Sequence, residues 1–344
     1  MKALVKWGLG DGEVGVRDMP EPAPSADRVL VQVRAAGVCG SDVHMWRNHQ
    51  SWEVKLPVVL GHEMAGVVVD AAGATGFRPG DRVVCETAAE VCGRCQFCRG
   101  GNYNLCPHRL GYGALADGAF TRYVSVSPQI VHRIPAGLPD HYAALAEPLC
   151  VALNGLVERA RIAPGDVVLI QGAGPIGIMA LQVAKVCGAG TVIVCGTDTD
   201  ATRLEVARTL GADVVMNVQH EDPLAVLAGL GEGAGADVVV DATGVSAALK
   251  QAMEYVRPMG QIAKIGWGPQ PLGFSLDPLV AKAVSLLGSF SHTYRTWERA
   301  LTLLSTGQVN LEPVIGGRYD LADWAEAFGA MQSGRNVKSV LTGF

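Results

Sequence analysis

The chain has 344 residues, of which 49% are hydrophobic and 18% are charged, and its formal net charge is −5. This composition excludes a mainly disordered protein and predicts about two globular domains, and the negative charge argues against a nucleic-acid or acidic-membrane partner. No apolar run reaches the roughly 20 residues of a membrane span, and the start MKALVKWGLGDGEV lacks a signal-peptide pattern. We therefore expect a cytoplasmic protein with reduced thiols.

Short strand-like runs separated by turn residues dominate residues 1–150, and they predict a mainly β domain. Within this region two glycine-flanked stretches carry possible metal ligands, namely Cys39 in GVCGSDVHMW and His62–Glu63 in LGHEMAG. A thiolate, an imidazole and a carboxylate are typical ligands of a catalytic zinc that keeps one position open. A single Cys or His is more often a packed residue, so these stretches alone leave the metal site undecided.

Four cysteines follow within sixteen positions, in VCGRCQFCRGGNYNLC. Cys92, Cys95, Cys98 and Cys106 lie in a Gly-, Arg- and Asn-rich loop without apolar periodicity. The chain has nine cysteines, an odd number that cannot pair completely, and the spacing is typical of ligands. We expect a closed tetrahedral zinc site that stabilises this loop, with buried free thiols or two disulfides as the alternatives.

A glycine-rich turn follows the apolar run VVLI, in DVVLIQGAGPIGIMALQVAKVCGAG over residues 166–190. The order strand, Gly172-Ala-Gly174-Pro-Ile-Gly177 and helix predicts a dinucleotide site. Gly172 permits the tight turn, Gly174 lets the backbone approach a pyrophosphate, and Gly177 allows close helix–strand packing. Strand-like and helix-like segments then alternate, which predicts a doubly wound parallel sheet.

These motifs together resemble the zinc-dependent medium-chain dehydrogenases/reductases, most of all the sorbitol (L-iditol) and polyol dehydrogenases, with threonine 3-dehydrogenases next. The resemblance rests on CGSDVH, GHEMAG, the four-cysteine loop, AEPLCVALNG, GAGPIG, DATG and VKSVLTG, and it covers essentially the whole chain. It implies an α/β fold in which residues 151–289 form a Rossmann domain. Residues 1–150 and 290–344 would form a GroES-like catalytic domain, with a structural zinc lobe near 86–108.

The resemblance also assigns roles around a catalytic zinc, the first of two zinc ions per chain. Cys39 and His62 match ligands, and Glu63 and Glu147 match acidic positions that bind the metal directly or through water. Glu63 could instead only support a ligand, and Glu147 could be only a charge at a domain hinge. Asp42 matches a carboxylate that orients the histidine, with a turn-capping role as the alternative.

Zinc would lower the pKa of a bound alcohol, and the hydride would pass to the nicotinamide. The proton has to leave a buried site, and Ser41 and His44 match the relay positions of the family. The alternatives are a loop hydroxyl and a surface histidine.

The cofactor residues depart from the usual pattern at one point. The acidic residue expected after the glycine turn is replaced by Gly196, which with Thr197 and Arg203 would suit NADP. Asp198 and Asp200 lie close by and favour NAD, which we expect over NADP. Further cofactor contacts implied by the resemblance are Pro175, Ile176, Thr243, Ile265 and Lys338.

We therefore predict reversible oxidation of a secondary alcohol in a polyol or cyclitol by a homo-oligomer, a tetramer or dimer. L-Threonine 3-dehydrogenase or a general secondary-alcohol dehydrogenase is the alternative. His292 stands where sorbitol dehydrogenases typically carry an arginine that contacts the polyol, so the exact substrate stays open. Two other classes, a zinc-lacking reductase and a non-catalytic binding protein, would not need Cys39, His62 and the four-cysteine loop as metal ligands.

Overall fold

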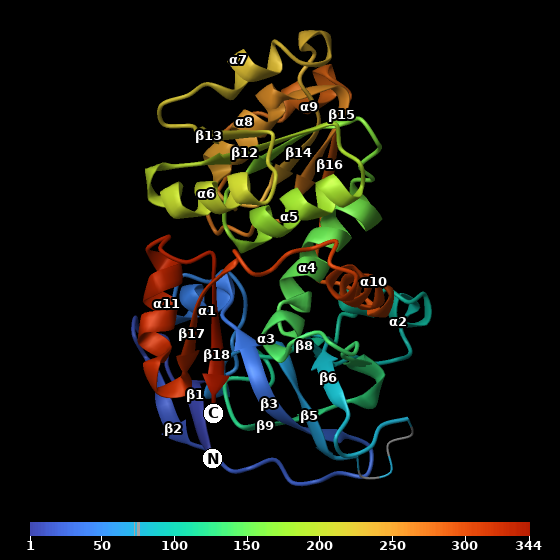
Figure 1. The fold of residues 1–344 in the computed structure, drawn as a ribbon, viewed down its shortest axis with the longest axis vertical. Helices are drawn as coiled ribbons and strands as arrows, with labels where there is room; N and C mark the ends of the chain where they lie inside the picture. Colours follow the sequence, from blue (N-terminus) through green and yellow to red (C-terminus); the bar gives the residue numbers. More distant parts are fainter. Residues whose placement is uncertain (72, 74–75) are drawn as a thin grey trace.

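A six-stranded parallel sheet with helices on both faces forms one half of the molecule (Figure 1). The computed structural model describes residues 1–71, 73 and 76–344. In spatial order the strands are β13 (Val214–Asn217), β12 (Thr191–Gly196), β11 (Val167–Gln171), β14 (Ala236–Asp241), β15 (Val256–Lys264) and β16 (Ser285–Gly288).

Successive side chains of the central strands enter two different cores, because strand geometry turns them to opposite faces. Val168 and Ile170 of β11 share one core with residues of α5 and α6, whereas Leu169 shares the other with residues of α7 and α8. The helices of this half are α5 (Pro175–Val186), α6 (Ala201–Thr209), α7 (Pro223–Leu227), α8 (Ser246–Tyr255) and α9 (Asp277–Ala281). The predicted doubly wound sheet is confirmed.

The other half is mainly β, as predicted. Its largest sheet runs in the order β10 (Val131–Arg133), β6 (Arg82–Cys85), β5 (Glu63–Asp70), β3 (Val29–Gly37), β18 (Lys338–Gly343) and β17 (Ile315–Asp320), and β9 (Tyr123–Val126) also pairs with β3. Two smaller sheets contain β2 (Val14–Asp18), β1 (Lys2–Lys6) and β4 (Val58–Val59), and β7 (Ala88–Glu90) and β8 (Leu110–Gly111). The C-terminal β18 pairs antiparallel with β3, so the end of the chain joins the N-terminal half (Figure 1).

Helices α4 (Ala146–Leu153) and α10 (Tyr294–Ser305) pack against each other near the junction of the halves (Figure 1). A π-helical turn over Asn154–Arg159 continues α4 toward the parallel sheet. The remaining helices are α1 (Gly40–Trp46), α2 (Gln96–Arg99), α3 (Asp140–Ala143) and α11 (Trp324–Gln332). A division at residues 150 and 289 stays our proposal, and the whole parallel sheet lies inside it. None of the described helices combines the length and the apolar character needed to cross a membrane.

Candidate active site

Three predicted metal ligands meet where β3 and β5 pair. Gly37 at the end of β3 pairs with Glu63 at the start of β5. Cys39 lies two residues after Gly37, and His62 lies one residue before Glu63, so both are next to this pair. One ligand atom of each residue, the Cys39 sulfur, a His62 ring nitrogen and a Glu63 oxygen, lies within 4.8 Å of the others. The strand register therefore brings together residues that are far apart in sequence.

The environment of Glu63 fits a bound cation. The side chain is fully buried, and Lys338 Nζ lies 2.5 Å from Oε1 and donates to Val38 O at 2.6 Å. Oε2 is buried and has no hydrogen-bond partner among the described residues. Burial raises the pKa of Glu63, and the charge of Lys338 opposes that shift. An unpartnered buried carboxylate oxygen is costly, and zinc bound by sulfur, nitrogen and oxygen would satisfy it.

Asp42 supports both ligand-bearing segments. Its carboxylate accepts hydrogen bonds from the backbone N–H of Cys39 at 2.8 Å and of Gly61 at 3.3 Å. Its Oδ1 lies 3.9 Å from Nδ1 of His62. Burial lowers the pKa of His62, but the charges of Cys39 and Asp42 outweigh it, so the pKa lies well above its ordinary value. Asp42 thus caps α1, and its carboxylate also faces His62; that it orients the histidine stays a prediction.

Glu147 is not in the group of ligand atoms that lie within 4.8 Å of one another, although its charge acts on His62 and Glu63. It sits in the first turn of α4, and its Oε1 is 3.0 Å from Nε2 of His292. Burial alone would raise the pKa of Glu147, but the hydrogen bond from His292 and the positive charge of Lys338 bring it below its ordinary value. The geometry therefore favours Glu63 over Glu147 as the direct ligand.

Ser41 and His44, the predicted proton relay, both lie on α1. The hydroxyl of Ser41 is buried and lacks a hydrogen-bond partner among the described residues, so it is free to bond a bound molecule. His44 lies one turn further along α1, reaches solvent and contacts Trp52 edge-on. Partial burial lowers the pKa of His44. The relay stays a prediction that this arrangement supports.

The four cysteines of the lobe also converge. All four sulfur atoms lie within 4.8 Å of one another, and all nine cysteines of the chain are free thiols, which excludes the disulfide alternative. Backbone N–H groups point at sulfur, from Cys95 to Cys92 and from Cys98 to Cys95, each at 3.4 Å. Such bonds from the N–H groups of Arg94 and Cys95 lower the pKa of Cys92 to about 6. The lobe fits a closed tetrathiolate zinc site.

The glycine turn after β11 has the geometry that its motif predicts. Gly172 has φ +98°, and a Cβ on Gly177 would lie 1.8 Å from the Gly172 oxygen. A Cβ on Gly174 would meet nothing within 4 Å, so the backbone faces open space where a pyrophosphate would lie. Thr243 closes the turn from the end of β14, since its methyl carbon would be 3.0 Å from a Cβ on Gly172.

Comparisons with known proteins agree with this geometry. Residues 25–136 match the alcohol dehydrogenase GroES-like domain, and residues 175–306 match the zinc-binding dehydrogenase family. Sorbitol dehydrogenase from Halalkalibacterium halodurans is 40% identical over 99% of both chains. D-arabitol-phosphate dehydrogenase from Enterococcus avium is 34% identical over 99% of this chain and 97% of its own. The chain belongs to the zinc-binding dehydrogenase family.

A solved putative zinc-binding dehydrogenase from Sinorhizobium meliloti, bound to NADP, has the same fold. Its TM-score is 0.90 at 30% identity, over 99% of this chain and 98% of that one. As a zinc-binding dehydrogenase, the protein is an oxidoreductase that acts on a small molecule with zinc and a nicotinamide cofactor. The predicted family, fold class and enzyme class are confirmed.

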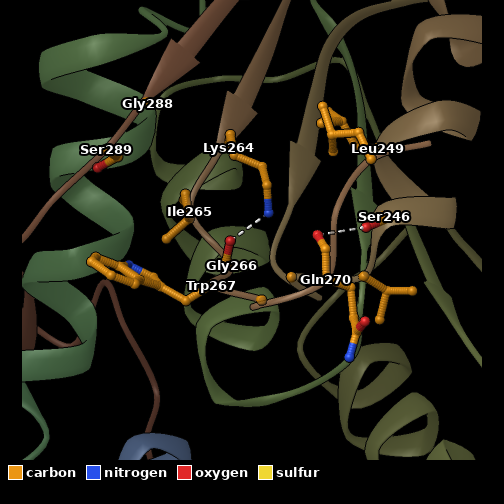
Figure 2. Close-up of a pocket in the computed structure, with 13 residues that line it drawn as sticks. Ser246, Leu249, Lys264, Ile265, Gly266, Trp267, Gln270, Gly288 and Ser289 are labelled. Carbon is orange, nitrogen blue, oxygen red and sulfur yellow. Dashed lines mark hydrogen bonds between the residues drawn. The ribbon is translucent and has the colours of Figure 1, made fainter. Parts of the chain in front are cut away.

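A pocket of about 340 Å³ opens at the carboxyl ends of β14, β15 and β16 in this zinc-binding dehydrogenase (Figure 2). Open parallel sheets bind ligands at this edge. Ile265, a predicted cofactor contact, lines the pocket together with Trp267 and Ser289. Figure 2 shows the ammonium of Lys264 directed at the Gly266 carbonyl, and this ammonium also lies 2.9 Å from Asp241. The sequence analysis did not single out Lys264, Trp267 and Ser289. Their only signal in the sequence is that they lie at or just after the ends of β15 and β16.

The region beyond β12 differs from the prediction for Arg203. Its guanidinium donates to Asp200 Oδ1 at 3.0 Å, Met331 O at 2.6 Å and Asn336 O at 3.3 Å. These contacts tie α6 to the C-terminal part of the catalytic half, so the predicted phosphate counter-charge is already engaged. The Thr197 hydroxyl likewise donates to Asp200, at 2.9 Å.

Two further predicted cofactor residues have visible partners. Asp198 is exposed and accepts hydrogen bonds from Asn217 Nδ2 at 2.6 Å and His220 Nε2 at 2.7 Å, two residues that sequence analysis missed. Lys338 is buried against Glu63, so its ammonium supports the metal ligands, and its predicted cofactor contact stays a prediction.

Proposed function

We propose that this enzyme reversibly oxidises a secondary alcohol of a polyol or cyclitol to the ketone with NAD. The observation that carries the proposal is the buried Oε2 of Glu63 beside Cys39 and His62, which has no hydrogen-bond partner in the part of the chain that the structure describes. The resemblance to enzymes named sorbitol and D-arabitol-phosphate dehydrogenase supports the substrate class. We also propose two zinc ions per chain, the catalytic one at Cys39, His62 and Glu63 and the structural one in the four-cysteine lobe.

Cys39, His62 and Glu63 would hold the zinc, which would supply a Lewis acid that lowers the pKa of a substrate hydroxyl, and the glycine turn at Gly172 would hold the nicotinamide cofactor, which would supply a hydride acceptor. Lys338 holds the Glu63 carboxylate in place, and Asp42 holds the segment that carries Cys39. Ser41, whose buried hydroxyl has no hydrogen-bond partner among the described residues, would accept the substrate proton while it releases its own proton toward His44 and solvent.

Polar acceptors favour hydroxyl-rich substrates over simple alkanols. Glu147 is ionised in its buried setting and offers carboxylate oxygens to a neighbouring hydroxyl. A site built to bond a hydroxyl discriminates strongly against a substrate that lacks one, because the buried polar group is then left unpaired.

The environment of the predicted ribose site supports NAD over NADP. Asp198 carries an exposed carboxylate there, and Arg203 pairs with Asp200 and donates to the carbonyls of Met331 and Asn336. A 2′-phosphate would therefore meet the like charge of Asp198, and the charge of Arg203 is already paired with Asp200.

A homo-oligomer and a cytoplasmic location complete the proposal. Apolar side chains are exposed along the edge of the parallel sheet, namely Val280 (82% exposed), Leu286 (38%) and Met259 (77%). A second copy of the chain would cover them, and light scattering after size-exclusion chromatography measures the state. The nine free thiols suit a reducing compartment.

One substrate panel tests the function. Reduction of NAD and of NADP is followed with sorbitol, xylitol, galactitol, a cyclitol, L-threonine and 2-butanol, after metal analysis of the purified protein. We expect a polyol with NAD to have the highest kcat/KM and the protein to hold two zinc ions per chain. A wide advantage for L-threonine or 2-butanol would overturn the polyol proposal, and a preference for NADP would overturn the cofactor proposal.

A further inference from the structure

The surroundings of His292 determine which of its nitrogens carries the proton. The side chains of His292 and Trp297 are buried, 1% and 0% exposed. Trp297 Nε1 donates to Nδ1 of His292 at 2.7 Å, and an indole nitrogen can only donate. Nδ1 is therefore the acceptor, so the single ring proton is on Nε2. That N–H points at Oε1 of Glu147, 3.0 Å away.

The segment that carries His292 is hydrogen-bonded to the four-cysteine lobe. Asn104 Nδ2 donates to Phe290 O at 2.8 Å, and the Tyr294 N–H donates to the hydroxyl of Tyr103. Arg109 Nη2 lies 3.4 Å from the hydroxyl of Ser291. Asn104 and Tyr103 of the lobe thus hold the two ends of the stretch 290–294, and Arg109, which follows the lobe, contacts Ser291 between them.

The backbone between these anchors is held in an unusual conformation. Ser291 has φ +56°, in the left-handed region that few non-glycine residues adopt, and it directly precedes His292. Such a conformation persists when its surroundings over-determine it. The anchors on either side therefore define where the imidazole of His292 lies.

We propose that His292 is a positioning residue, fixed by Trp297 and the lobe, that holds the carboxylate of Glu147 apart from the metal-ligand group of Cys39, His62 and Glu63. A catalytic zinc site needs one position free for substrate, and a second carboxylate that swung in would occupy it. By bonding Oε1, His292 keeps Glu147 as an acceptor beside that position. The inference rests on the proposed function for the role given to Glu147.

The test compares two variants of His292. His292→Leu removes the donor to Glu147, whereas His292→Gln retains an N–H donor of similar reach. The first readout is the visible absorption spectrum of the cobalt-substituted protein without substrate, in which the four-cysteine lobe provides an internal reference. The second is the separate change in kcat and KM.

We expect His292→Leu to alter the cobalt spectrum and to lower kcat on the order of 10- to 100-fold, the range seen when a partner of a metal-site residue is lost. His292→Gln should recover most of both properties. Trp297→Phe, which removes only the indole donor and frees the imidazole to change tautomer, should fall between them.

His132→Gln is the matched control, because His132 is a buried imidazole that stacks on Trp297 at 5.5 Å between ring centroids but bonds Glu86 and Glu298. Its cobalt spectrum should equal that of the wild type. An unchanged spectrum and kcat in folded His292→Leu would overturn the proposal, as would equal losses in the Leu and Gln variants. If His292→Leu does not fold, an unchanged Trp297→Phe overturns it.

The outcome is separable from that of the proposed function. The spectrum is recorded without any substrate, and the kinetic comparison uses whichever alcohol of the panel the wild type oxidises fastest. A failure of the polyol proposal would leave the cobalt result intact.

Discussion

The ion pair between Lys338 and Glu63 should make an unusually large contribution to stability when zinc is absent. Both side chains are buried, 1% and 0% exposed, with Nζ 2.5 Å from Oε1. Lys338→Met would leave the Glu63 carboxylate buried without a counter-charge and Val38 O without its donor. Breaking a buried pair by removing one partner costs about 3–5 kcal/mol. We expect a loss of that size in the free energy of unfolding after chelation.

Zinc should reduce the loss, because a bound cation replaces part of the missing positive charge. The assay is urea unfolding followed by tryptophan fluorescence, in zinc-loaded and in chelated protein. A second variant, Lys338→Met combined with Glu63→Gln, removes the uncompensated charge and should regain at least half of the loss in chelated protein. With Glu63→Gln alone as the fourth protein, these variants form a double-mutant cycle that separates the pair interaction from the loss of packing.

Lys6→Met provides the matched control. Lys6 is also fully buried, but its ammonium has no hydrogen-bond partner among the described residues. The carboxylates whose charges act on Lys6, Glu13 and Asp11, are not buried, so replacing Lys6 leaves no buried charge behind and we expect an unchanged or higher free energy of unfolding. A loss below about 1 kcal/mol for Lys338→Met in chelated protein would refute the ion-pair reasoning, given the cost expected for an orphaned charge.

Four further changes test the cofactor site, the lobe and the parallel sheet. Asp198→Asn should raise kcat/KM for NADP relative to NAD several-fold, because it removes a charge that repels the 2′-phosphate, and an unchanged ratio would place Asp198 outside the site. Gly177→Ala should weaken NAD binding in a fluorescence titration and lower the Tm, since its Cβ would lie 1.8 Å from Gly172 O. Cys95→Ser should lower the zinc content from two ions per chain to one and lower the Tm, and a Tm equal to that of the wild type would contradict a stabilising lobe. Although burial raises the pKa of Asp213, an ammonium and a backbone N–H that bond the carboxylate bring it below its ordinary value. The ionised Asp213 therefore stabilises the fold above its unfolded-state pKa, and this stabilisation is lost as pH falls through its folded-state pKa. Asp213→Asn should flatten the acid side of a plot of Tm against pH, and an unaltered plot would contradict the prediction.

The parts of the site that depend on neighbouring residues were predictable from the sequence. The spacing of the lobe cysteines indicates convergent thiols because a short loop can bring them together, and their sulfur atoms do converge. The glycine turn at Gly172 was predictable for the same reason, since a positive φ and a close backbone approach are properties of one turn. The family resemblance then added the order of the two halves.

Contacts between distant segments were decided only by the tertiary structure. Glu147 meets His292 across 145 positions, and Glu63 meets Lys338 across 275. Arg203, a candidate phosphate ligand by sequence, is bound to backbone carbonyls of Met331 and Asn336 instead. The chemical type of a side chain and its neighbours in the sequence limit which groups it can bond. Only the tertiary structure determines which partner lies within bonding distance. For buried polar groups that partner sets the charge, the tautomer and the orientation, because water is no longer available to compete.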